Sequence, residues 1–269
     1  MTQVSARLPK LSVRSQGFIG GLATFLLLAS WGYLLKMIWD MQHMDMSAMM
    51  NSMAMSSEIS SQWNLGELAW LIMMWAVMMI AMMLPSALPM IISFAKINQK
   101  KQAADGSVVL PISGFVAGYL SVWTLFSVVA GLTQWTFNGF FLLSPMMVSS
   151  SPILGGTLLL GAGLFQFSPL KDRCLSHCRS PLGFLMSEYR AGVWGAFVMG
   201  LKHGSFCVGC CWILMALLFV GGVMNLVWIV GLAAYVLVEK MIPKGKRLSQ
   251  LTGAALALWG IIVLVRPII

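Results

Sequence analysis

The chain has 269 residues, of which 59% are hydrophobic and only 9% are charged, and its formal net charge is +9. A mean hydropathy of +0.85 excludes an ordinary soluble domain and indicates a helical membrane protein in contact with the lipid bilayer. The basic residues stand in short clusters between apolar runs, which argues against nucleic-acid binding.

The apolar runs predict an all-α fold, a polytopic transmembrane helix bundle of about seven spans. Residues 1–16 are expected to form a cytoplasmic tail and residues 17–269 a single membrane domain. The first run lacks a small-residue cleavage site and is interpreted as an uncleaved anchor. The expected spans are 18–39, 68–92, 111–133, 153–167, a fifth that ends near 221–222, 226–238 and 251–265. The last run is the weakest, so a six-span variant stays open.

The basic residues also predict how these spans are oriented. They recur in every second segment between the spans: the N-terminus, 96–101, 171–190 and 240–247. Cytoplasmic segments are enriched in lysine and arginine, so the N-terminus is expected inside and the C-terminus outside the membrane. Pro85 and Pro89 are expected to kink the end of the second span.

The outward loop, residues 40–66, is rich in methionine. Its part from 41 to 55 holds seven methionines and one histidine, among them His43, Met44 and Met46, and no cysteine. Thioether ligands favour Cu(I) or Ag(I) and, unlike thiols, do not form disulfides in an oxidising compartment. We expect this loop to collect Cu(I); the alternative is a compositionally biased loop without function.

The second span carries a methionine pattern of its own. Met74, Met78 and Met82 follow one face of the expected helix, and Met79 and Met83 follow an adjacent face. A methionine ladder that faces the bundle interior could pass soft ions from the outer loop to the thiols. Ordinary core packing is the competing interpretation.

The cysteines form two groups with the same spacing, both expected near the inward side. Cys207, Cys210 and Cys211 stand at i, i+3 and i+4 of one helical face in the fifth span, and His203 lies one turn earlier. Three thiols and an imidazole suit Cu(I) or Zn(II), and the cytoplasm keeps thiols reduced. Buried cysteine as a small packing residue is the alternative.

The second group, Cys174, His177 and Cys178, reads C-x-x-H-C and follows the fourth span. Lysine and arginine side chains nearby would help an anionic thiolate site to form. The two groups could share one metal ion or pass it between them. A polar turn with incidental cysteines is the alternative.

Two further features of the fifth and sixth spans concern packing and charge. Gly200 and Gly204 form a G-x-x-x-G motif, to which Gly209 adds a small position, and they predict close helix contact. Lys202 and Glu239 are ionisable residues close to apolar spans and are functional candidates for that reason. An ion pair between them is a hypothesis.

Three blocks of the sequence carry a family resemblance: 82–90 (MMLPSALPM); 169–171 with Cys174, Cys178, Arg179 and Pro181; and His203, Gly204, Cys207, Gly209, Cys210, Cys211, Trp212, Met215 and 222–225, with Glu239 and Lys240 beyond. They resemble a bacterial family of predicted metal-binding integral membrane proteins that is associated with copper chaperones. The resemblance covers most of the chain from Leu68 to Pro243 and implies a location in the bacterial inner membrane and metal binding. It leaves chaperone and transporter open, and the outer methionine loop lies outside it.

These observations favour a membrane protein that binds Cu(I), or else zinc, for copper handling or for delivery to a cuproprotein or membrane complex. His203, Cys207, Cys210 and Cys211 would be the primary ligands, and no catalytic residue is expected. The sequence contains no P-loop motif, so active pumping by this chain alone is not expected. One alternative is a thiol–disulfide oxidoreductase that uses Cys207 with Cys210 or Cys211 against a quinone. The other is a metal-free assembly subunit of a membrane complex.

Overall fold

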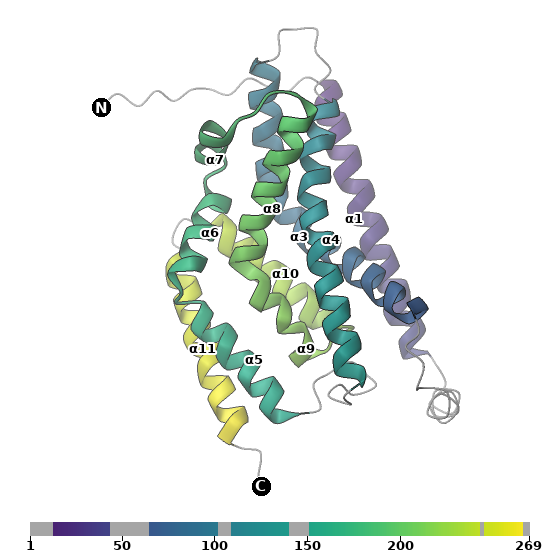
Figure 1. Cartoon of the computed structure of the whole chain (residues 1–269), viewed down its shortest axis with the longest axis vertical. Coiled ribbons are helices and arrows are strands. Elements are labelled where there is room, and N and C mark those ends of the chain that lie inside the picture. Colours follow the sequence, from purple (N-terminus) through teal and green to yellow (C-terminus); the bar gives the residue numbers. More distant parts are fainter. Residues whose placement is uncertain (1–12, 44–64, 102–108, 140–150, 243–244, 266–269) are drawn as a thin grey trace.

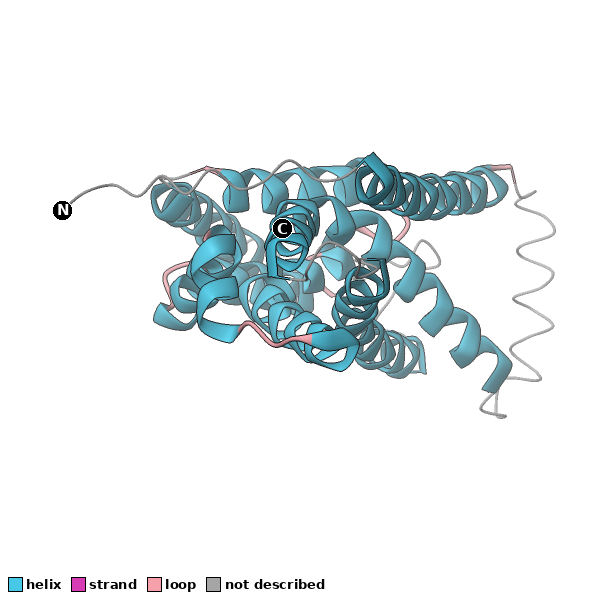
Figure 2. Cartoon of the chain, turned by 90° about the horizontal axis from the view of Figure 1, so that it is seen from above, coloured by secondary structure: helices cyan, strands magenta, loops and turns pink. Residues whose placement is uncertain are grey.

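The computed structural model describes residues 13–43, 65–101, 109–139, 151–242 and 245–265. Within these ranges every regular element is a helix, so the all-α prediction is confirmed for them (Figure 2). The helices are α1 (Val13–Gln42), α3 (Leu65–Lys101), α4 (Val109–Gly139), α5 (Pro152–Phe165), α6 (Pro169–Arg179), α7 (Pro181–Glu188), α8 (Gly192–Ala216), α9 (Leu218–Gly221), α10 (Leu226–Met241) and α11 (Gly245–Val265).

Five stretches of the described chain are long and apolar enough to cross a membrane, which is compatible with a membrane protein. They are α1, α3, α4, α8 together with α9, and α11. The pair α5 and α6 would make a sixth crossing, but it bends by 65° at the break between the two helices. At about 1.5 Å per residue, the 16 residues of α10 span less than a typical hydrocarbon core. The expected number of seven spans and their orientation therefore stay predictions.

The break between α5 and α6 results from the local sequence. Ser168 caps α6 by accepting a hydrogen bond from the backbone N–H of Leu170 at 3.1 Å, and Pro169 occupies the first turn, where its missing N–H costs nothing. A proline also disfavours helical backbone in the residue before it, so α5 cannot run on into α6. The chain turns here and lays α6 along α8.

Helix α8 packs against α4 in backbone contact, as the G-x-x-x-G motif predicted. A Cβ atom built on Gly200 would lie 2.9 Å from the carbonyl carbon of Phe115 and 3.0 Å from the amide nitrogen of Tyr119. A Cβ atom on Gly118 of α4 would lie 2.9 Å from the nitrogen of Leu201. Figure 1 shows α3, α4 and α8 side by side in the centre of the molecule.

Helices α5 and α11 form a second pair that also depends on glycine. A Cβ atom on Gly163 would lie 2.7 Å from the carbonyl oxygen of Gly253, and one on Gly260 would lie 2.6 Å from the nitrogen of Leu160. The weak last run of the sequence therefore has a close packing partner, and the two helices lie beside the central bundle in Figure 1.

Helix α3 passes through the middle of the bundle and contains both Pro85 and Pro89. Figure 1 shows that this helix changes direction along its length, and proline inside a helix removes a backbone hydrogen bond and favours such a bend. The carbonyl of Met83, two residues before Pro85, accepts hydrogen bonds from the hydroxyls of Ser86 at 2.9 Å and Tyr119 at 3.1 Å. The bend thus lies next to the cysteine motif.

Candidate metal centre

Four thiols converge inside the bundle from α6 and α8. Cys207, Cys210 and Cys211 are buried on one stripe of α8. Cys178 reaches them from α6, and its thiol lies close to those of Cys207 and Cys210. The thiol of Cys211 makes the same two contacts. We call these four residues the thiol cluster.

The thiol cluster is held partly by backbone. The thiols of Cys210 and Cys211 both donate to the carbonyl oxygen of Cys207, at 3.1 Å and 3.0 Å. Among the described residues, no three histidine, cysteine, aspartate or glutamate side chains are arranged to hold a metal ion as they stand. Rotation about the Cα–Cβ bonds of Cys210 and Cys211 would release both sulfurs from this carbonyl.

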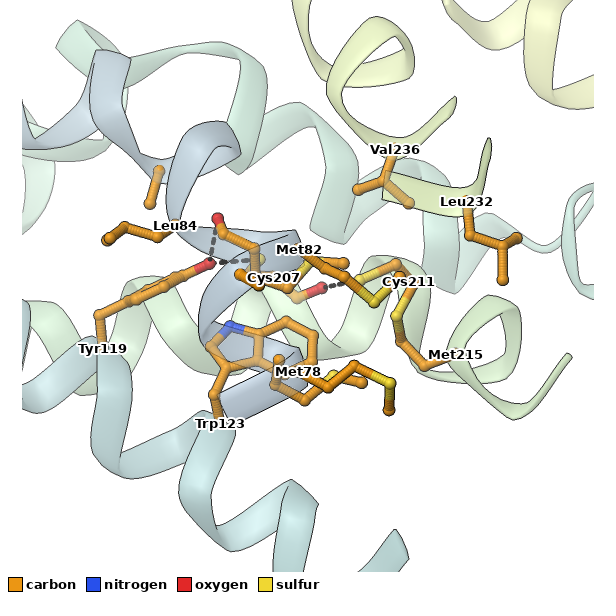
Figure 3. Close-up of a cluster of buried hydrophobic side chains, with 14 of the residues drawn as sticks. Met78, Met82, Leu84, Tyr119, Trp123, Cys207, Cys211, Met215, Leu232 and Val236 are labelled. Atoms are coloured by element: carbon orange, nitrogen blue, oxygen red, sulfur yellow. Dashed lines mark hydrogen bonds between the residues drawn. The ribbon is translucent and has the colours of Figure 1, made fainter. Parts of the chain in front are cut away.

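A lysine and a tyrosine from two other helices contact the sulfur of Cys207. The Nζ atom of Lys240, on α10, lies 2.9 Å from this sulfur and 2.9 Å from the hydroxyl of Ser86. The hydroxyl of Tyr119, on α4, lies 3.3 Å from the same sulfur (Figure 3). Neither role was predicted from the sequence. The signal available for Lys240 was its place beside Glu239, directly after an apolar run.

The methionines of α3 line the same region. Met78 and Met82 are buried, and so are Met74, Met79 and Met83. Figure 3 shows Met78, Met82 and Met215 around Cys211, so thioether and thiol side chains lie close together in the core. Both methionine faces of α3 are therefore buried in the bundle.

The three side chains of the C-x-x-H-C group, Cys174, His177 and Cys178, do not share one site. Cys174 is buried against α8, where a Cβ atom on Gly209 would lie 2.8 Å from its sulfur. The exposed ring of His177 stacks on Phe206 at 4.2 Å, and its Nδ1 atom lies 2.9 Å from the carbonyl oxygen of Arg173. Of this group, Cys178 makes the thiol contacts with Cys207 and Cys210.

His203 is buried in an aromatic pocket one helical turn before Cys207. The residue is 3% exposed, and its ring centroid lies 5.6 Å from that of Tyr119, 5.7 Å from that of Phe184 and 6.0 Å from that of Phe115. The Nδ1 atom has no hydrogen-bond partner among the described residues. A buried, unpartnered imidazole nitrogen is an unusual and costly feature, which a ligand would satisfy.

A second buried polar network is centred on Glu239. The ammonium group of Lys171, from α6, lies 2.7 Å from Oε1 of Glu239, and both side chains are almost fully buried. Gln166 bonds to Lys171, and Tyr235 and Ser249 bond to the same carboxylate oxygen. The network ties α6, α10 and α11 together.

The hypothesis that Lys202 pairs with Glu239 is therefore wrong. Lys202 instead forms an ion pair with Glu188, at the end of α7. The hydrogen bond from Lys202 holds the pKa of the Glu188 carboxyl below its usual value. The partner of Glu239 is Lys171, and the sequence does not show that α6 packs beside α10 and brings these two residues together.

The outer candidates are described only in part. The exposed ring of His43 stacks on Trp39 at 4.1 Å, and its Nδ1 atom lies 2.9 Å from the carbonyl oxygen of Trp39. Met44 and Met46 lie outside the described residues, so the methionine loop stays a prediction.

The comparisons with known proteins agree with the chemistry of the core. The model of the PpoB2 family, described as copper chaperone, matches residues 72–263, a range that contains the whole thiol cluster and Lys240. None of the curated proteins and none of the solved structures matches the chain. The family match extends over well more than half of the sequence and agrees with the resemblance seen in its three blocks. The chain belongs to the PpoB2 copper chaperone family.

Proposed function

We propose that this protein is a membrane copper chaperone that binds Cu(I) at the thiol cluster and passes it to a cuproprotein or a membrane complex. One observation carries the proposal: the thiol of Cys178 on α6 lies next to those of Cys207 and Cys210 on α8, and the thiol of Cys211 lies next to the same two. Thiolates are the ligands that Cu(I) prefers, and they favour it over hard divalent ions such as Mg²⁺. The copper ion is the cargo of the protein and not a resident cofactor.

Loading of the cluster exchanges protons for metal. Binding of one Cu(I) by two thiols releases two protons and leaves a dithiolate complex with a net charge of −1. Cys207 and Cys178 are the best placed pair, because their sulfurs already meet across α6 and α8. Cys210 and Cys211 add further thiolates once their side chains turn away from the carbonyl of Cys207.

The surrounding methionines and His203 extend the proposal. Thioethers bind Cu(I) weakly enough to exchange it, so Met78 and Met82 suit a path that leads to the thiols. In the predicted orientation the path begins at the outer loop with His43, Met44 and Met46. His203 serves as an additional ligand, and Cys174 and His177 form the border of the site.

The proposal is tested by Cu(I) binding to the purified, detergent-solubilised chain under reducing conditions. Competition against a colorimetric Cu(I) chelator gives the affinity for wild type, Cys207→Ser and Cys178→Ser. Each substitution is expected to weaken binding by at least about tenfold, which corresponds to about 1.4 kcal/mol. Cys174→Ser is the matched control, because this thiol on the same helix as Cys178 packs on Gly209.

The same samples separate the proposal from its alternatives. Wild type that binds no Cu(I), or affinities equal in all four proteins, would contradict the thiol cluster as a copper site. A reversible Cys207 disulfide found by mass spectrometry, without bound copper, would support a thiol–disulfide oxidoreductase. The proximity of the thiols of Cys178 and Cys207 is the feature that favours this second candidate.

A further inference from the structure

We infer that Lys240 determines which metal charge the thiol cluster accepts: its buried ammonium group favours a monovalent ion over a divalent ion held by the same two thiolates. This inference rests on the proposed function and adds to it a specificity-determining residue from a helix that contributes no thiol. It follows from the position of the lysine, from the anions around it and from the charge of the metal–thiolate complex.

The position of Lys240 is fixed on two sides. Its side chain is 9% exposed, and Nζ donates to the sulfur of Cys207 and to the hydroxyl of Ser86, each at 2.9 Å. The Ser86 hydroxyl in turn donates to the carbonyl of Met83 at 2.9 Å. The ammonium group is therefore held against the metal-binding sulfur by a bend of α3.

No carboxylate competes for this ammonium group in the described part of the chain. The ion pairs there join Lys171 to Glu239, Lys202 to Glu188 and Lys246 to Asp172. Glu239, the neighbour of Lys240, turns its Oε1 atom to Lys171, Tyr235 and Ser249. The thiolate that forms at Cys207 when metal binding releases its proton is thus the anion placed to balance Lys240.

The charge of the complex then decides which ion is preferred. Two thiolates with Cu(I) or Ag(I) carry a net charge of −1, which one ammonium group neutralises. The same two thiolates with a divalent soft ion such as Hg(II) are already neutral, and the ammonium group leaves an excess of +1. An unbalanced charge in a buried site is costly because little solvent is present to screen it.

Ag(I) and Hg(II) test this inference, because both are soft ions that accept two thiolates and they differ by one unit of charge. Affinities for both ions are measured by thiol competition on the full-length, detergent-solubilised chain. Lys240→Gln keeps a hydrogen-bond donor and removes the charge. It is expected to lower the ratio of Ag(I) to Hg(II) affinity by about tenfold or more. Lys240→Arg is expected to keep the wild-type ratio, because it keeps the charge.

Two further variants make the result decisive. Lys202→Met removes a lysine of α8 whose partner is Glu188, and its affinity ratio should equal that of wild type. Lys240→Met takes the place of Lys240→Gln should the latter fail to fold, as judged by its helical circular dichroism. An equal loss of affinity for both ions in the neutral variants, or no loss for either, would overturn the role of Lys240 in specificity. Wild type that binds neither ion would instead overturn the proposed function, and this inference with it.

Discussion

Cys207 connects the parts of the candidate site. Its carbonyl oxygen accepts the thiols of Cys210 and Cys211, and its sulfur contacts Lys240 and Tyr119. The first two contacts follow directly from helix geometry, since side chains at i+3 and i+4 can reach the carbonyl of residue i. The last two need α4 and α10 to be in place. The contacts of this one residue therefore depend both on the geometry of α8 and on the packing of α4 and α10 against it.

His203 yields a prediction with two separate readouts. His203→Phe keeps an aromatic ring among Phe115, Tyr119 and Phe184 and removes the unpartnered Nδ1 atom. An unsatisfied buried polar atom costs about 1–3 kcal/mol, so the variant is expected to unfold at a higher temperature than wild type. If the imidazole is also a ligand, Cu(I) affinity falls by at least about tenfold.

Thermal unfolding in detergent and chelator competition measure the two effects of His203→Phe on the same sample. Higher stability with unchanged Cu(I) affinity would make His203 a packing residue and remove it from the ligand set. A variant less stable than wild type would contradict the cost assigned to Nδ1.

At the scale of helices, α6 matters most, because it is short and polar and yet supplies Cys178. The ion pair between Lys171 and Glu239 attaches this helix to α10. Arg179, at the other end of α6, donates to the backbone carbonyl of Glu239 at 3.0 Å and 2.7 Å. Two cations of one short helix thus hold it at a single residue of α10, which keeps Cys178 at the thiol cluster.

The buried ion pair predicts a characteristic pattern of stabilities. Lys171→Met leaves the Glu239 carboxylate buried without its cation and should lower the free energy of unfolding by about 3–5 kcal/mol. The double variant Lys171→Met with Glu239→Met removes both charges and should recover most of that loss. Denaturation in detergent measures the stabilities, and the rate of Cys178 alkylation, expected to rise in the single variant, reports on α6. A double variant as unstable as the single one would contradict a simple ion-pair role.

The sequence predicted features within one helix better than features between helices. The stripe of Cys207, Cys210 and Cys211 and the contact at Gly200 depend on spacing along one chain segment, and the structure contains both. The separation of His177 from Cys178 depends on how α6 lies on α8, which no spacing encodes. Lys240 was assigned to a basic loop because a lysine at the end of an apolar run usually faces water. Here it turns inward to Cys207.

At the scale of the whole molecule, the direction of each helix bears on the number of membrane crossings. Successive long helices run in opposite directions between two ends of the bundle in Figure 1. The end of α10 lies beside α6, because Arg179 reaches the carbonyl of Glu239. Helix α11 then returns along α5, with Gly253 near Gly163 and Gly260 near Leu160. The predicted path with seven crossings counts α5 and α6 as one crossing and α10 as a short one, whereas five of the described stretches, or six with the bent pair, are long and apolar enough to cross.

Reporter fusions to the full-length chain test this path. Seven crossings with the N-terminus inside place the C-terminus outside, so alkaline phosphatase fused after Ile269 should be active and a fluorescent protein there should be dark. A fluorescent protein inserted between residues 102 and 108 is the control and should fluoresce, because lysines precede this segment. If α10 does not cross, α11 begins on the outer side and both C-terminal results are reversed. The C-terminal pair of fusions therefore tests whether 16 residues are enough for α10 to cross, which is possible where a bilayer thins around a short helix.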